Sequence, residues 1–269
     1  DRKNFQTEIT FPNQDSYETF VEKLLHKADT TYSTKQPIAD GTINGIVRVH
    51  AVHKSLCESG PYLTLRINRY NTVEIKDLVS SGLAPQPIFD YLKACVRTGN
   101  TVLIAGEVAT GKTTLLRAIS TAIPDEQSVL VIEDTPEIKL EHPHVRYIST
   151  REENIEKEGR VSPSSLIRAG MRMAMNRIIF GEIRDSEAAE AFIDVCISGH
   201  PGCSTIHARS ASEAIARLEL LLSRAQPGVE HNVLIEQIAR AVNVIIHVDL
   251  CTKTGKRRIF EVRELNVPS

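Results

Sequence analysis

The chain has 269 residues, with 32 Lys and Arg against 34 Asp and Glu, a balance that is not typical of a constitutive nucleic-acid binder. No apolar run approaches the roughly 18 residues of a membrane span, and the first residues lack the apolar core of a secretory signal. The five cysteines are an odd number without C-x-x-C spacing, which argues against a disulfide framework or a zinc module.

The first part of the chain, residues 1–72, predicts a small α+β domain. Apolar residues at three- and four-residue spacing predict a helix from Tyr17 to Ala28. The dipeptide Asp40-Gly41 indicates a turn. Alternating apolar and polar residues then predict two strands, Gly45 to Val52 and Tyr62 to Asn68.

Arg48 and Arg66 lie on the polar sides of these two predicted strands. If the strands pair, both side chains emerge on the same face of the sheet. The pattern alone leaves two interpretations open: a pair of solvated sheet arginines or a functional pair.

Residues 73–86 have little periodicity and contain Ser-Ser-Gly and a proline, which predicts a linker. From residue 87 to 269, apolar strands alternate with amphipathic helices. This alternation predicts an α/β domain with a mostly parallel sheet, helices on its faces and ligands at the carboxyl ends of the strands. The basic run from Lys253 to Arg258 is expected to be a solvated hairpin turn without a function of its own.

Strands are expected at 102–105, 129–132, 145–148, 178–180, 204–206 and 244–248. Helices are expected from Ile88 to Gly99 and at 112–122, 163–174, 186–198, 212–224 and 230–241.

A glycine-rich loop follows the first of these strands. Residues 106–113 match the pattern G-x-x-x-x-G-K-[ST] between an apolar strand and a predicted helix. Backbone N–H groups and the helix N-terminus converge on an anion in such a loop, and Lys112 adds a positive charge. The predicted ligand is a nucleoside triphosphate with Mg²⁺ held by the Thr113 hydroxyl. The candidate nucleotide-binding residues are Gly106, Glu107, Val108, Ala109, Thr110, Gly111, Lys112, Thr113 and Thr114.

Two carboxylates follow apolar strands at the edge of the sheet where the phosphates are expected. Glu133 comes directly after one strand, and Glu182 follows another. A carboxylate in such a position either holds Mg²⁺ or orients and deprotonates the attacking water. The spacing leaves the assignment of the base open, and a helix cap or loop carboxylate remains the alternative for each.

His207 follows a further apolar strand, after a run of small residues. A histidine there can donate a hydrogen bond to the terminal phosphate and respond to its loss after hydrolysis. A purely structural histidine is the alternative. The sequence contains no Cys/His/Asp cluster with the spacing of metal ligands.

Several segments, in order along the chain, resemble the type II/type IV secretion ATPases. Residues 131–137, 177–184 and 199–208 are similar to the Asp box, Walker B and His box of that family. Residues 48–51 and 60–66 resemble the end of its N-terminal domain. The resemblance covers most of the chain and is nearest to VirB-type, conjugative-transfer and Tad-pilus members.

The resemblance implies a RecA-like P-loop NTPase domain, preceded by a smaller α+β N-terminal domain that begins partway through its usual extent. It further implies a homohexameric ring that binds ATP and Mg²⁺ between the two domains. Thr113 and Glu182 would serve the metal, and arginines of the N-terminal domain would reach the phosphates. The residues to which the resemblance gives catalytic roles are Glu133, Glu182, His207, Arg48, Arg66 and Arg184.

The implied function is to power type IV secretion or conjugative transfer. Assembly or retraction of a type IV or Tad pilus is the alternative within the family, and a RecA-like nucleic-acid translocase is the alternative outside it. The implied partners are further copies of the chain and secretion or pilus proteins at the inner membrane. We expect a cytoplasmic protein, peripheral on the cytoplasmic face of that membrane, with no direct nucleic-acid binding.

Two departures from the family pattern are visible. Residues 172–177 read Arg-Met-Ala-Met-Asn-Arg, where the family often has Arg-Met-Arg-Pro-Asp-Arg. The tetracysteine zinc element of the type II branch is absent from the sequence, which disfavours that branch.

Overall fold

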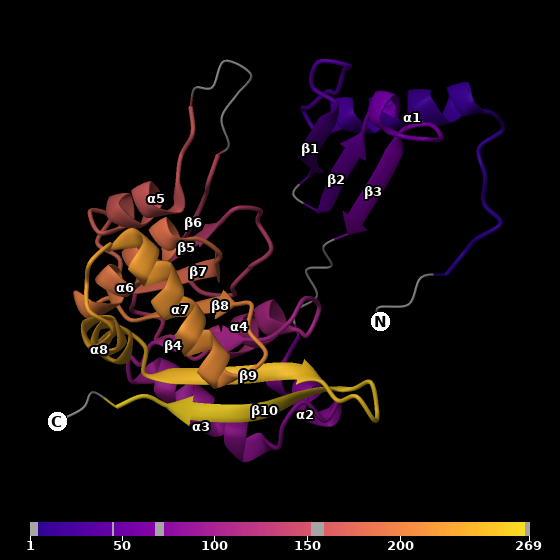
Figure 1. Ribbon diagram of the computed structural model, residues 1–269. Helices are drawn as coiled ribbons and strands as arrows, with labels where there is room; N and C mark the ends of the chain where they lie inside the picture. The colour runs from indigo at the N-terminus through magenta and orange to yellow at the C-terminus, as the bar shows by residue number, and fades with distance from the viewer. Residues whose placement is uncertain (1–4, 45, 68–72, 152–158, 267–269) are drawn as a thin grey trace. The chain divides into compact units, whose positions relative to one another are not determined.

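The computed structural model describes residues 5–44, 46–67, 73–151 and 159–266 (Figure 1). Its contacts divide the chain into two compact units, Asp1–Asn71 and Thr72–Ser269.

The N-terminal unit is an antiparallel sheet covered by one helix. The sheet has the order β1-β2-β3, with β1 (Ile38–Ile43), β2 (Val47–Val52) and β3 (Tyr62–Ile67), and a single 3-10 turn, η1 (Lys54–Leu56), follows β2. Helix α1 (Gln14–Lys27) contributes Val21 and Leu25 to a core that also contains Val49 and Ala51 of β2. The predicted helix and both predicted strands are confirmed.

Strand β1 corrects the expectation of a turn at Asp40-Gly41, because both residues lie within the strand. A Cβ atom at Gly41 would lie 2.7 Å from Cβ of Ala28, at the end of α1. The glycine therefore allows a close approach of strand and helix. A glycine required for close packing and a glycine required for a turn look the same in the local sequence.

The C-terminal unit is built on a seven-stranded sheet with the order β10-β9-β4-β8-β7-β5-β6. Every neighbouring pair is parallel except β9 and β10, which form an antiparallel hairpin. The strands are β4 (Val102–Ala105), β5 (Val129–Glu133), β6 (Val145–Ser149), β7 (Arg177–Ile183), β8 (Gly202–Ile206), β9 (Val244–Leu250) and β10 (Arg257–Glu264). The helices are α2 (Ile75–Ser80), α3 (Gln86–Arg97), α4 (Lys112–Ser120), α5 (Pro163–Gly170), α6 (Ser186–Ile197), α7 (Ala211–Ala225) and α8 (His231–Ala241).

Helices cover both faces of this sheet (Figure 1). One apolar cluster joins the sheet to α5, α6, α7 and α8, and the other joins it to α2, α3 and α4. The sequence of β4 is a continuous apolar run because both faces of the strand are buried. Leu103 faces the first cluster and Ile104 faces the second. The predicted α/β fold with a mostly parallel sheet is thus confirmed.

The structure differs from the linker predicted for residues 73–86. Helix α2 lies within this segment, and Leu78, Leu83 and Ala84 are buried in the same cluster as α3. A helix of this length presents too few apolar positions to give a recognisable period, so the pattern did not reveal it.

Candidate nucleotide-binding and catalytic site

The phosphate loop, residues 106–113, joins β4 to α4 through a backbone shape that depends on particular residues. Ala109 and Gly111 have φ angles of 63° and 98°, in the left-handed region. A Cβ atom on Gly106 would lie only 2.3 Å from the carbonyl oxygen of Val248 in β9, so only glycine fits there. Alternating backbone conformations of this kind turn successive N–H groups toward one point, as an anion site requires.

Lys112 folds its side chain over this loop. Its Nζ donates hydrogen bonds to the carbonyl oxygens of Gly106 at 3.0 Å and Glu107 at 2.9 Å. Thr110, which is fully buried, donates to the same Glu107 carbonyl at 2.9 Å. Burial lowers the pKa of Lys112, while the charge of Glu182 acts in the opposite direction. The ammonium group therefore belongs to the loop and also interacts with a carboxylate at the end of β7.

Two arginines from distant segments contact the loop from outside. Arg209 Nε, just before α7, donates to Glu107 Oε1 at 3.0 Å. Arg257 Nε, at the start of β10, donates to the carbonyl oxygen of Ala109 at 3.2 Å. The predicted hairpin at residues 253–258 is confirmed, since β9 and β10 pair on either side of it. The contact of Arg257 with the loop is an addition to the solvated turn that the sequence predicted.

At the carboxyl ends of β8, β7 and β5, four side chains form a cluster that we name the strand-end network: His207, Glu182, Arg184 and Asp134. Glu182 Oε1 lies 2.7 Å from His207 Nε2, and Glu182 Oε2 lies 2.7 Å from Arg184 Nη2. Arg184 Nη1 lies 3.2 Å from Asp134 Oδ2, and Thr150 donates to the other oxygen of Asp134 at 3.0 Å. The sequence singled out the first three residues separately, whereas Asp134 and the pairing itself emerge only from the strand order.

The environment of His207 favours the neutral imidazole. Burial lowers its pKa, the nearby charge of Lys112 lowers it further, and Glu182 opposes both effects. Because the pKa lies below 6.5, the uncharged imidazole predominates near neutral pH. These mutual charge effects indicate that the strand-end network adjoins the phosphate loop.

Glu133 has different surroundings from Glu182. It is only 7% exposed, and its Oε1 accepts hydrogen bonds from the backbone N–H groups of Glu137 at 3.0 Å and Ile138 at 3.1 Å. Burial raises the pKa of Glu133 to about 7, despite those hydrogen bonds. A Cβ atom at Gly181 in β7 would lie 3.1 Å from Cγ of Glu133. Glu133 is thus a carboxylate shielded from water, whereas Glu182 lies beside cationic groups.

The remaining candidate residues take two kinds of position. Thr113 and Thr114 lie in the first turn of α4 and are partly exposed, whereas Val108 is 65% exposed in the loop. Arg48 and Arg66 are direct neighbours across β2 and β3, so they share one face of the N-terminal sheet. The predicted pairing of these strands is confirmed, and the approach of the two arginines to a nucleotide stays a prediction.

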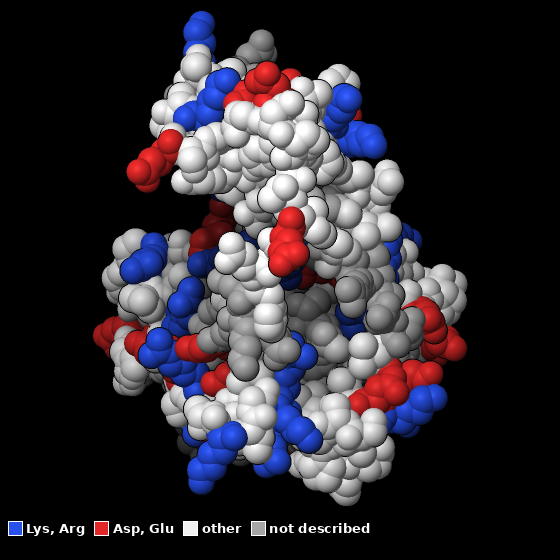
Figure 2. Space-filling model, turned by 90° about the vertical axis from the view of Figure 1, so that its right-hand side faces the viewer, with Lys and Arg blue, Asp and Glu red and all other residues white. Residues whose placement is uncertain are grey.

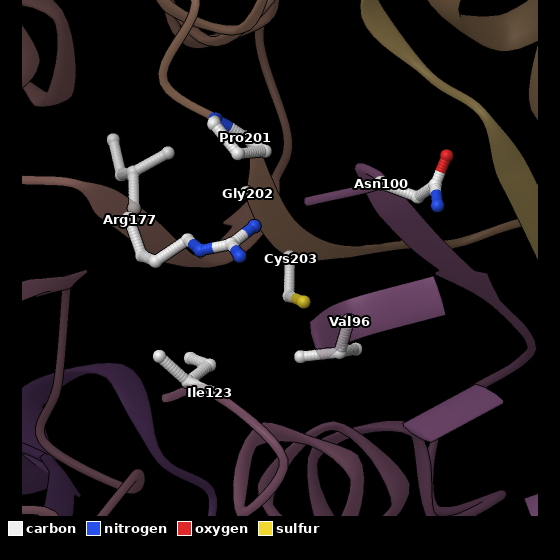
Figure 3. Close-up of a pocket in the computed structure, with 8 residues that line it drawn as sticks. Val96, Asn100, Ile123, Arg177, Pro201, Gly202 and Cys203 are labelled. Atoms are coloured by element: carbon white, nitrogen blue, oxygen red, sulfur yellow. The ribbon is translucent and has the colours of Figure 1, made fainter. Parts of the chain in front are cut away.

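A small pocket lies at the opposite ends of the strands (Figure 3). Arg177 opens β7, Gly202 opens β8, and the Arg177 guanidinium points into the pocket toward Cys203. Arg177 is 6% exposed and donates to Gln127 Oε1 at 2.5 Å and to the carbonyl oxygen of Arg97 at 3.3 Å. These bonds make it a structural link between the sheet and its flanking segments.

Within the described residues, no group of three or more His, Cys, Asp or Glu side chains is arranged to hold a metal ion by itself. The same part of the chain contains no helix with the length and apolar character to span a bilayer.

Similar proteins agree with this architecture. Residues 18–267 match the family described as type II/IV secretion system protein. The chain is 31% identical over 267 residues to a Mycobacterium tuberculosis protein named for conjugal transfer, covering 97% of this chain and 75% of that one. It is 30% identical over 259 residues to the type IV secretion system protein PtlH of Bordetella pertussis, covering 86% of this chain and 75% of PtlH.

Solved structures show the same fold. The VirB11 ATPase of the Brucella suis type IV secretion system aligns with a TM-score of 0.59 at 26% identity, over 92% of this chain and 80% of that chain. The pilus retraction motor PilT aligns with a TM-score of 0.63 at 20% identity, over 85% of this chain and 63% of PilT, which supports the fold alone. On these grounds the chain belongs to the type II/IV secretion system protein family of ATPases.

Proposed function

We propose that the protein hydrolyses ATP to power type IV secretion or conjugative transfer. The observation that carries the proposal is the position of Lys112, which lies in a preformed phosphate loop and interacts electrostatically with Glu182 and His207 at the neighbouring strand ends. Such an arrangement brings a phosphate site, carboxylates and a hydrogen-bond donor to one edge of the sheet. The names of PtlH and VirB11 support the choice of transport process.

The residues present fit ATP and Mg²⁺. Left-handed φ angles at Ala109 and Gly111 shape the loop for an anion, and Gly106 leaves no room for a side chain. Thr113 in the first turn of α4, together with Glu182, would hold Mg²⁺. The ion would neutralise the charge that develops on the phosphate oxygens during transfer.

Glu133 is the residue that we assign as the general base. A catalytic base works best when its pKa lies near the working pH, and burial brings the pKa of Glu133 to about 7. Its hydrogen bonds to the backbone N–H groups of Glu137 and Ile138 hold the carboxylate in place. Glu182 already contacts Arg184 and His207. It is therefore better suited to balancing positive charge than to accepting a proton from water.

His207 is the residue that we assign to the terminal phosphate. In the described structure its Nε2 contacts Glu182 at 2.7 Å. A terminal phosphate oxygen would compete with Glu182 for His207 Nε2, so nucleotide binding would replace the contact with Glu182 and hydrolysis would restore it. Arg184 and Asp134 would carry that change from β7 to β5.

Ring assembly completes the proposal. We propose that Arg48 and Arg66 contact the phosphates from the N-terminal unit when subunits form a homohexamer. An arginine supplied by another domain stabilises the negative charge on the phosphoryl group during transfer. The proposed location is the cytoplasmic face of the inner membrane, where secretion proteins are the partners.

The alternatives are a pilus motor and a nucleic-acid translocase. A pilus motor would use the same chemistry, and the similarity to PilT supports the fold alone. A nucleic-acid translocase would need a basic channel, whereas basic and acidic side chains are interspersed on the face drawn in Figure 2.

The direct test is phosphate release by the full chain with ATP and Mg²⁺, compared with Lys112→Ala. We expect turnover in the native protein and loss of both hydrolysis and tight nucleotide binding in the variant, because the loop keeps its backbone but loses its charge. Equal turnover in the two proteins would refute the loop assignment. Single-stranded or duplex DNA at low salt should neither bind nor alter the rate; stimulation by DNA would favour the translocase.

A further inference from the structure

We propose that Arg257 is a positioning residue that holds the phosphate loop in its nucleotide-binding conformation, an inference that rests on the function proposed above. Arg257 is the first residue of β10 and lies far from the loop in sequence. Its Nε donates a hydrogen bond to the carbonyl oxygen of Ala109. A Cβ atom built on Gly111 would meet Arg257 Cδ at 3.3 Å, so the arginine stem lies over that glycine.

The contact acts on the peptide group that the phosphate site needs. The carbonyl of Ala109 and the N–H of Thr110 belong to one planar trans peptide, so they point in opposite directions. A donor that holds the carbonyl on the outside of the loop therefore directs the N–H of Thr110 toward the inside. The stem over Gly111 restricts rotation of the next peptide in the same way.

The loop has a physical need for such support. Ala109 adopts a φ of 63°, a conformation that costs an L-residue about 1 kcal/mol. Without an external partner for its carbonyl, rotation of the Ala109–Thr110 peptide would turn the Thr110 N–H away from the phosphates. The hydrogen bond from Arg257 opposes this rotation.

The hairpin contacts both ends of the loop. At the root, the carbonyl oxygen of Val248 in β9 occupies the space that a side chain on Gly106 would need. Near α4, Arg257 covers Ala109 and Gly111. The β9–β10 hairpin is thus a support for the loop, and nucleotide affinity depends on a segment that carries no nucleotide-binding motif.

The chain offers a matched control in Arg258. It follows Arg257 directly in β10, is also exposed, and pairs across the hairpin with Asp249. Because successive residues of a strand point to opposite faces, its side chain leaves the sheet on the other side. Arg258→Ala therefore removes the same charge from the same strand without touching the proposed contact.

The experiment compares Arg257→Ala, Arg257→Lys and Arg258→Ala with the native full chain. It measures KM and kcat for ATP with Mg²⁺, the Kd for ADP, and the thermal midpoint. We expect Arg257→Ala to raise KM and the ADP Kd about five-fold, the effect of losing one exposed hydrogen bond, with kcat within about two-fold. Arg257→Lys should recover most of the affinity, because its ammonium can donate to the Ala109 carbonyl. Arg258→Ala should behave like the native protein, and all midpoints should agree.

Three results would overturn the proposal. The first is a nucleotide affinity of Arg257→Ala equal to that of Arg258→Ala. The second is a loss of affinity in Arg257→Ala that Arg257→Lys does not restore. The third is a loss of affinity accompanied by a lower thermal midpoint. ADP binding separates this test from that of the proposed function. If the native chain shows no turnover but Arg257→Ala still binds ADP more weakly than the native chain, the positioning role stands while the proposed hydrolysis does not. A native chain that binds neither nucleotide would remove both.

Discussion

Glu133→Gln tests whether burial tunes the proposed base. The pKa of Glu133 is raised from 4.5 to about 7, chiefly by burial, so the folded chain favours the protonated carboxyl group. The stabilising effect of protonation is complete below about pH 4.5, decreases as the pH rises, and is lost above about pH 7. Glutamine does not titrate in this range, so the variant lacks this dependence.

The expected magnitude follows from the two pKa values. Between pH 5 and pH 8 the native chain should lose about 2.5 kcal/mol of unfolding free energy relative to Glu133→Gln. Oε1 of Glu133 accepts from the backbone N–H groups of Glu137 and Ile138, and the glutamine oxygen can do the same. Oε2 also accepts from Ile138, and the glutamine –NH2 group cannot, but this loss is the same at both pH values and cancels in the difference between them. All other titrating groups are common to the two proteins and cancel in the difference.

The assay is urea unfolding of both proteins at pH 5 and pH 8, following the transition of the C-terminal unit, together with ATP turnover over the same range. Native turnover should rise about ten-fold from pH 6 to pH 8 as Glu133 ionises, and the variant should be about 10² to 10⁴ slower while binding nucleotide normally. A stability difference that stays constant with pH would refute the burial argument. Unimpaired turnover in the variant would refute its role as base.

Three further predictions concern the loop, the second carboxylate and the N-terminal unit. Gly106→Ala should lower the thermal midpoint and weaken ADP binding at least ten-fold, since its Cβ would lie 2.3 Å from the Val248 carbonyl oxygen; normal binding by calorimetry would contradict this. Glu182→Gln should reduce turnover less than Glu133→Gln does in a phosphate-release assay, and the reverse order would exchange their roles. Arg48→Ala and Arg66→Ala should each depress turnover without unfolding the chain or abolishing assembly, and activity per subunit should rise with protein concentration; unchanged kinetics in both variants would make them solvated sheet residues.

Local signals explain which features the sequence could predict. The phosphate loop and the alternating strands of the C-terminal unit are encoded by contiguous residues, so their pattern is complete without the fold. Strand β1 was missed because Asp40-Gly41 suggests a turn, whereas Gly41 is required by contact with Ala28. Helix α2 was missed because it is short.

The site was predicted residue by residue, but its connections were not. Glu182 and His207 each follow an apolar strand, which is a local signal. Their contact depends on β7 and β8 being neighbours, and the link to Asp134 depends on β5 lying next to β7. The sequence predicted the hairpin that carries Arg257, but the contact of Arg257 with Ala109 depends on β9 lying next to β4 and so has no local signal.

The position of β4 inside the sheet, between β9 and β8, has a consequence for how the protein is made. Val102 of β4 pairs with Cys203 of β8 on one side and with Val244 of β9 on the other. Both partners come from the last third of the chain, so the strand that carries the phosphate loop leaves the ribosome long before either neighbour exists. Such long-range pairing slows folding and leaves apolar strand edges exposed in the meantime. The nascent chain should therefore acquire nucleotide binding only after β9 and β10 are synthesised, and the C-terminal unit needs protection from aggregation until both strands have left the ribosome.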